Sequence, residues 1–445
     1  MPAFAGMTML TGMTLVFPAH ALEFKATLEA EGRAFWQAEG HPIPAAASAT
    51  IEIFHGWDND HQRIKGEFFG RYDDSDEART HDDVRELYYQ VIGEDFEFRL
   101  GARRVYWGVA ESRHLVDIIN QSDLVEDLDA KAKLGAPMMN LALVHDWGVV
   151  DFFLLPYARA RTFPGPGGHP ALPFPVNANE ALYESPQQQR HLDYAARYTG
   201  SFGPLDFGVG GFDGTAREPH LLPCLRRGST LGGAPRGTEN GPNCNLASLT
   251  QSSGGPVDVT PILQQFGLAP SDAQLQQEAR NNLVLVPYYD RWRQVSLDAQ
   301  YLIESLALKM EALHRARQTG GSYAAVAGFE YNFGDVPLLG ADVSVLGEYL
   351  YDEDDEGLNA LFDDEVFAGT RFGFNDVAGT SILAGVIADR DNFRSRLASI
   401  EAARRLGDDW RLALKARLFA EIPDDSAAKF LEKQDYVTLS LERFF

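Results

Sequence analysis

The chain has 445 residues, 45% of them hydrophobic, and a formal net charge of −25 at pH 7. The acidic excess excludes nucleic acid as a partner, because a nucleic-acid-binding surface needs clustered positive charge. No run of about 18 apolar residues occurs, which excludes a transmembrane α-helix. The moderate overall hydrophobicity does not exclude a membrane barrel. In the strands of such a barrel, polar and apolar positions alternate, so their contributions to the overall hydrophobicity cancel.

Residues 1–21 are predicted to be a secretory signal peptide. Met7 to Phe17 is mostly apolar, and Ala19-His20-Ala21 has the small-x-small pattern of a cleavage site. The segment lacks the Lys or Arg of a usual positive n-region. We expect cleavage after Ala21 and export across the inner membrane.

The first predicted strand follows directly. From Leu22 to Trp36 the even positions are apolar or small, whereas the odd positions from Glu23 to Arg33 are charged or polar. Such a strand has one face toward lipid and one toward a wet interior. Its roughly fifteen residues exceed the ~5–6 that are common in soluble strands. The pattern favours a strand of membrane height.

The same alternation predicts an all-β fold, a transmembrane antiparallel up-and-down β-barrel of eighteen strands, with sixteen as the alternative. The expected spans are 22–37, 47–58, 63–73, 83–93, 95–108, 136–145, 148–161, 189–201, 204–215, 283–303, 306–317, 322–333, 340–352, 364–375, 377–390, 392–405, 409–421 and 434–445. Short turns are expected at the end that holds both termini, and mostly long loops at the other, as in outer-membrane barrels.

Only helices and closed barrels span membranes. We therefore expect residues 22–445 to form one barrel domain in the outer membrane of a Gram-negative bacterium. Its expected partners are membrane lipid, lipopolysaccharide, the barrel-assembly machinery and a small solute. The oligomeric state is left open.

The segment 109–137 does not alternate, and it is apolar enough to pack against another surface. We interpret it as a loop folded into the barrel, since a lumen this wide would otherwise be an open channel. The alternative is an extracellular loop packed outside the pore. The expected constriction residues are Glu111, Arg113, His114, Asp117, Asn120, Asp123, Glu126 and Asp127. The expected basic residues of the lumen wall are Arg99, Arg103, Arg159, Arg161 and Arg197.

Opposed acidic and basic walls select small polar or charged solutes. We expect the acids of this segment to face the arginines of the neighbouring strands across the pore. The segment holds six acids and three bases, which favours weak cation preference unless the wall arginines reverse it.

A resemblance strengthens the channel interpretation. Trp107-Gly108 is followed by the stretch from Leu115 to Asp123, which contains Asp117 and Asn120. This arrangement resembles large single-chain outer-membrane channels that include the alginate exporter and related porin-like barrels. The resemblance implies a barrel channel with an inward loop. That family's strongly basic lumen is not evident here, so a polyuronate is not implied as the solute.

The longest connection, 216–282, is expected to be an extracellular loop, and it contains the only two cysteines, Cys224 and Cys244. In an oxidising compartment we expect them to form a disulfide. They have no Cys or His neighbours at zinc-binding spacing.

An acidic loop begins at Asp352. Asp352, Asp354 and Glu356 place carboxylates at positions 1, 3 and 5 of a calcium-loop pattern, with Gly357 at position 6. Position 12 is Asp363, where such loops usually carry Glu. We interpret the segment as a solvated acidic loop, with calcium as the alternative and no other cofactor expected.

The chain ends in an alternating strand whose apolar parity runs through Leu441 to the terminal Phe445. These two residues are the predicted C-terminal assembly signal. None of the common hydrolase, zinc-protease, dinucleotide or P-loop motifs occurs, so we expect no enzyme.

The sequence favours a passive porin-like channel for small polar or charged solutes. One alternative is a structural or assembly barrel that scaffolds a partner and has a plugged lumen. Another is a carrier for hydrophobic solutes, which needs an apolar lumen pocket and a lateral opening. The segment 109–137 discriminates: mixed charge beside a gap indicates a channel, whereas apolar sealing indicates a scaffold.

Overall fold

The computed structural model describes residues 22–36, 43–166, 168–170, 172–236, 241–246, 258–318, 320–354, 364–391, 393, 396–422 and 429–445. The predicted signal peptide lies outside these ranges. No helix in this part of the chain is long and apolar enough to cross a membrane.

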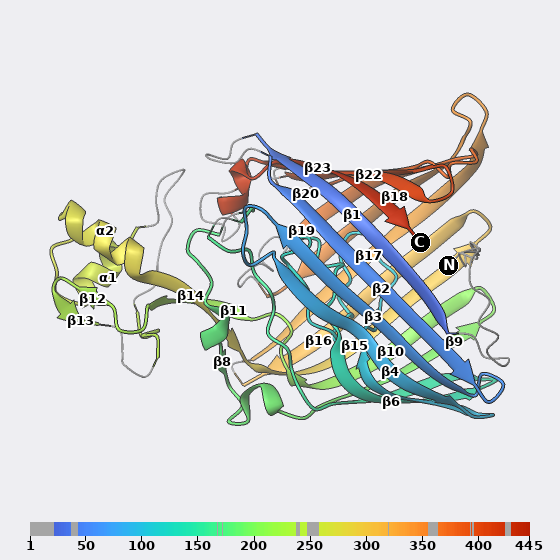
Figure 1. The fold of residues 1–445 in the computed structure, drawn as a ribbon, viewed down its shortest axis with the longest axis horizontal. Helices are drawn as coiled ribbons and strands as arrows, with labels where there is room; N and C mark the ends of the chain where they lie inside the picture. The colour runs from blue at the N-terminus through green and yellow to red at the C-terminus, as the bar shows by residue number, and fades with distance from the viewer. Residues whose placement is uncertain are drawn as a thin grey trace.

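Eighteen of the strands in the described residues form one closed antiparallel barrel (Figure 1). They are β1 (Glu23–Phe35), β2 (Ala45–Trp57), β3 (Gln62–Asp73), β4 (His81–Ile92), β5 (Phe96–Arg103), β6 (Ala136–His145), β7 (Gly148–Leu155), β9 (Asp193–Phe202), β10 (Leu205–Thr215), β15 (Arg291–Ile303), β16 (Leu306–Arg317), β17 (Gly320–Val336), β18 (Ala341–Asp352), β19 (Asp364–Phe374), β20 (Ser381–Asp389), β21 (Arg396–Leu406), β22 (Trp410–Ala420) and β23 (Tyr436–Phe444). The predicted strand number is confirmed.

The first and last strands close the barrel. β1 pairs with β23 from Thr27↔Phe444 to Phe35↔Tyr436. Phe445 extends this ladder by exchanging backbone hydrogen bonds with Ala26, at 2.9 and 3.3 Å. The start of β1 and the C-terminus therefore lie at the same end as the short turns, such as that between β2 and β3.

Side-chain parity separates the two faces of the wall. On β16 the outward Leu308 and Met310 are exposed, whereas Glu311, Leu313 and Arg315 are buried in the interior. Leu441 and Phe445 of the predicted assembly signal also point outward, with 36% and 48% of their surface exposed. The outer face is thus apolar and the lumen polar, as alternation demands.

Most predicted strand ends differ from the observed ones by a few residues, and three predicted strands, 95–108, 148–161 and 283–303, differ by more. β5 ends at Arg103 and β7 ends at Leu155, so Arg159 and Arg161 belong to a loop and are not lumen-strand residues. The predicted strand 283–303 is two strands, β14 (Leu283–Tyr289) and β15. β14 is not part of the barrel wall. Both of its faces are covered by protein, and its unbroken run of apolar residues suits a strand that is buried on both faces.

The described parts of residues 216–290, namely 216–236, 241–246 and 258–290, form a folded lobe that projects from the long-loop end of the barrel (Figure 1). β14 pairs antiparallel with β11 (His220–Leu225) and parallel with β8 (Leu182–Tyr183). The remaining short elements are η1 (Ala178–Glu180), η2 (Gln188–Arg190), β12 (Thr230–Leu231), β13 (Ala234–Pro235), α1 (Thr260–Gln265), α2 (Ala273–Asn282) and, before β23, η4 (Lys429–Lys433).

The lobe has an apolar core of its own. Leu225, Leu231, Ile262, Leu263 and Leu283 are fully buried within it. The predicted disulfide between Cys224 and Cys244 is confirmed and joins β11 to the segment that follows β13. A cross-link beside a small core suits a projection too small to be stabilised by burial alone.

Candidate functional site: the inward segment and the lumen

Residues 104–135, here called the inward segment, connect β5 to β6. The segment contacts lumen-facing side chains on β3, β16, β18, β19 and β22. These strands lie on several sides of the barrel, so the segment crosses its interior.

Two carboxylates on the wall hold the segment by its backbone. Glu311 on β16 is fully buried and accepts N–H groups from Val109, Ala110 and Val116 at 2.7, 2.8 and 3.2 Å. Glu348 on β18 accepts the N–H groups of the next two residues, 111 and 112, at 2.7 and 2.8 Å. An irregular segment has no ladder for its donors, and these charged acceptors replace one.

Gly108 makes this approach possible. Its φ is 111°, and a Cβ there would lie 2.5 Å from Glu311 Oε1. A side chain would therefore clash with the carboxylate and strain the backbone. The Trp107-Gly108 pair serves the docking of the segment; it does not close a strand.

Asn120 ties together the two ends of the inward segment. It is fully buried, and its Oδ1 accepts the N–H of Val105 at 2.8 Å. Its Nδ2 donates to the carbonyls of Arg103 and Leu134 at 2.8 and 2.9 Å. One amide thus satisfies three backbone groups where the chain enters and leaves the lumen.

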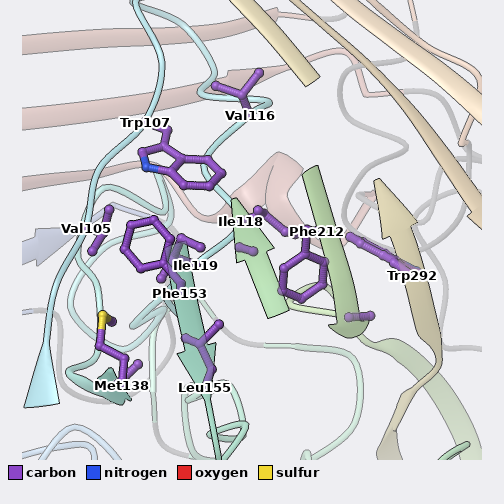
Figure 2. Close-up of a cluster of buried hydrophobic side chains, with 13 residues drawn as sticks. Val105, Trp107, Val116, Ile118, Ile119, Met138, Phe153, Leu155, Phe212 and Trp292 are labelled. Atoms are coloured by element: carbon purple, nitrogen blue, oxygen red, sulfur yellow. The ribbon is translucent and has the colours of Figure 1, made fainter. Parts of the chain in front are cut away.

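One side of the inward segment is sealed by apolar packing. Trp107, Val116 and Ile119 pack with Phe153 of β7 and other residues of β6, β9, β10 and β15, as Figure 2 shows. The rings of Trp107 and Phe153 meet edge to face at 5.8 Å. No water-filled passage is expected through a core packed in this way.

The other side is charged. Glu126 binds Arg71 on β3 at 2.9 Å, and Asp127 binds Lys415 on β22. Asp129 binds Arg417, also on β22, at 3.3 Å. Glu111 binds Arg371 on β19 at 2.6 Å.

A cavity of about 420 Å³ lies between this charged side and the wall formed by β1 and β19–β23. Its acidic lining residues are Glu29, Glu31, Glu126, Asp127, Glu401 and Glu442, and its basic ones are Arg33, Arg371, Arg411 and Lys415. The side chains of Arg371, Arg411 and Lys415 are 41%, 43% and 36% exposed, whereas that of Asp127 is 8% exposed. Arg371, Arg411 and Lys415 therefore protrude into the space, as does Glu401 at 34% exposed, whereas Asp127 is set behind them.

The predicted opposition of acids and arginines is wrong. Arg99 and Arg103 both donate to Asn140, and Arg197 pairs with Asp298 at 2.8 Å. Arg159 pairs with Asp83, and Arg161 donates to Gln121. The segment leaves from β5 and carries Glu126, Asp127 and Asp129 to bases on β3 and β22 instead.

Of the eight predicted constriction residues, only Glu126 and Asp127 line the cavity, whereas Glu111, Arg113, His114, Asp117, Asn120 and Asp123 do not. Asp117 is buried beside Lys133 at 3.5 Å, and burial raises the pKa of its carboxyl. His114 lies 4.0 Å from Glu311, and burial lowers the pKa of its imidazole. Asp123 accepts a hydrogen bond from Thr162 at 2.7 Å. In contrast, Lys415 and Arg417 outweigh the effect of burial and lower the pKa of Asp127, which keeps that group charged.

The calcium alternative also loses two ligands. Asp352 pairs with Arg113 at 3.0 Å, and Asp354 pairs with Arg317. Arginine thus neutralises the two carboxylates that the calcium pattern needs. Glu356 lies outside the described residues.

No family model matches the sequence, and no curated protein matches it. Among solved structures, the fold resembles a loop L8 deletion mutant of OmpT, an outer membrane protein of Vibrio cholerae, with a TM-score of 0.45 and 10% identity over 96% of this chain and 100% of that one. It also resembles a mutant Rh. blastica porin, with a TM-score of 0.40 and 8% identity over 96% and 100% of the two chains. Such distant likeness says nothing of solute or mechanism, and the barrel rests on its own strand pairings.

Proposed function

We propose that the protein is a passive channel for small polar or charged solutes in the outer membrane of a Gram-negative bacterium. The observation that carries this proposal is the charged cavity that remains between the inward segment and the wall of β1 and β19–β23. A gap lined by both signs of charge orients and passes hydrated solutes, and an apolar plug does not.

The outward faces support the membrane location. Leu28, Phe24 and Leu439 are exposed on adjacent strands near the barrel seam. In water such a surface would drive association, whereas in a bilayer it is the required one. Lipid and lipopolysaccharide would cover this surface, and the outward Leu441 and Phe445 would serve as the signal for barrel assembly.

We expect weak cation preference. Six acids and four bases line the cavity, so the solute path has a net negative lining. The protruding bases moderate this preference, because they meet the solute first. Neutralising a base should therefore have a larger effect than neutralising a buried acid such as Asp117.

The scaffold alternative is favoured by one observation, the apolar seal around Trp107 and Phe153. It requires that the charged cavity also be closed to solutes. Recording purified protein in planar bilayers separates the two functions: a channel gives discrete current steps, and a plugged scaffold gives none. Reversal potentials in a salt gradient then measure the preference.

A further inference from the structure

Three side chains converge where the inward segment meets β4. His81, at the start of β4, places Nε2 3.3 Å from Asp123 Oδ2 and 3.9 Å from Glu126 Oε1. All three atoms lie within 4.8 Å of one another, and no other such group occurs in the described part of the chain. Ligands bound to Zn²⁺ at about 2.0–2.2 Å stand roughly 3.4 Å apart in a tetrahedron, so this spacing fits one cation.

The imidazole is oriented as a metal ligand. His81 Nδ1 lies 2.9 Å from the carbonyl oxygen of Arg79. A carbonyl only accepts, so Nδ1 carries the proton and Nε2 faces the two carboxylates. Metal-binding histidines are commonly held in this way by their second nitrogen. A neutral ring would turn its lone pair toward two anions unless a cation lay between them.

Both carboxylates are also held from behind. Asp123 Oδ1 accepts the Thr162 hydroxyl at 2.7 Å, which leaves Oδ2 toward His81. Glu126 receives Arg71 at 2.9 Å on each oxygen, and each oxygen retains a second lone pair. The three ligands thus come from two segments, His81 from β4 and the two carboxylates from the inward segment, and are held in place before any ion binds.

The surrounding charges leave room for a cation. The network around the site contains five carboxylates, those of Glu29, Glu31, Asp73, Asp123 and Glu126. It contains four guanidinium groups, those of Arg33, Arg71, Arg79 and Arg85. With His81 neutral, one negative charge remains, which a bound cation compensates.

We propose that His81, Asp123 and Glu126 bind one divalent transition-metal cation, such as Zn²⁺, and that water completes its coordination. One imidazole and two carboxylates suit such an ion better than calcium, which prefers oxygen ligands alone. The ion would cross-link the inward segment to β4. Binding can be measured whether or not the barrel conducts, so this proposal and the channel proposal fail separately.

The test is Zn²⁺ titration of the purified, folded full-length barrel by calorimetry, with metal content measured after gel filtration. We expect one Zn²⁺ per chain. His81→Gln and Asp123→Asn should abolish binding. Thr162→Val removes the hydroxyl that orients Asp123 and should weaken Zn²⁺ affinity about ten-fold, because losing a group that orients a metal ligand costs about 10–100-fold in affinity. His145→Gln, a change at the short-turn end of β6, is the matched histidine control and should bind as the native protein does.

Zinc K-edge absorption of the loaded protein should show one imidazole nitrogen with oxygen ligands, and this readout does not depend on any variant folding. If the native protein does not retain Zn²⁺, the proposal is overturned. A proton on His81 would then supply the positive charge between these groups. Equal binding by native protein and by folded His81→Gln protein would place the metal elsewhere and overturn it as well.

Discussion

The docking of the inward segment should depend on Glu311. Glu311→Ala removes the acceptor of three buried N–H groups, those of Val109, Ala110 and Val116. Hydrogen bonds to a charged group contribute about 1.5–3 kcal/mol each, which sums to roughly 4.5–9 kcal/mol if they are independent. The three act as a unit, and removing a buried carboxylate relieves its own desolvation, so we expect a net loss of about 3 kcal/mol.

A loss of this size shifts the docking equilibrium roughly 100-fold, since 1.36 kcal/mol corresponds to a factor of ten. Glu348 still holds residues 111 and 112 in Glu311→Ala protein, so this variant should show larger current steps only intermittently. The double variant Glu311→Ala with Glu348→Ala should show the larger current steps persistently. The assay is single-channel conductance in planar bilayers. Glu311→Gln keeps an acceptor oxygen without the charge and should fall between native protein and Glu311→Ala.

The matched control is Glu52→Ala on β2. It removes one lumen-facing carboxylate that makes no hydrogen bond or ion pair to the inward segment within the described residues, and it should leave the size of the current step near the native value. If the double variant folds and its conductance equals that of the native protein, the two carboxylates do not hold the segment in place.

Three further predictions concern selectivity, the segment ends and the lobe. Arg411→Met or Lys415→Met should move the reversal potential toward cations and Glu442→Gln toward anions, because all three line the cavity; unchanged potentials would place the ion path elsewhere. Asn120→Ala leaves three buried backbone groups unpaired, and at about 1 kcal/mol for each group it should lower the free energy of unfolding by about 3 kcal/mol. Heat-modifiability gels should show this loss as a lower unfolding temperature. Replacing both cysteines by serine opens a loop with a sequence separation of 20, which contributes roughly 3 kcal/mol in the chain-entropy model, so the lobe should become protease-sensitive while the barrel stays folded.

Alternation was sufficient to predict the barrel, because lipid on one side and water on the other impose a period of two on each strand. It failed at Leu283–Tyr289, where a strand covered on both faces reads as an apolar run without a period. It also extended β7 as far as Arg161, since alternating residues in a loop look the same as those in a strand.

The inward segment could be recognised by its lack of alternation, but its partners could not. Glu311 meets Val109 across 202 positions of sequence, and Lys415 meets Asp127 across 288. Such contacts depend on how far around the wall the segment travels, which local patterning does not encode. The arginines of β5 were predicted to face the acids of the inward segment only because β5 is close to that segment in sequence.

In the proposed channel, solutes pass through the cavity beside the inward segment. Ser381 lines that cavity and is exposed, whereas Val386 on the same strand points outward to lipid. In the described residues both cysteines are joined in the disulfide, so an introduced cysteine is the only target for a thiol reagent. The decisive measurement is single-channel current through Ser381→Cys protein before and after a bulky methanethiosulfonate reagent. We expect a smaller current step after modification of Ser381→Cys protein and no change in Val386→Cys protein. If modified Ser381→Cys protein conducts as before, solutes do not pass through this cavity.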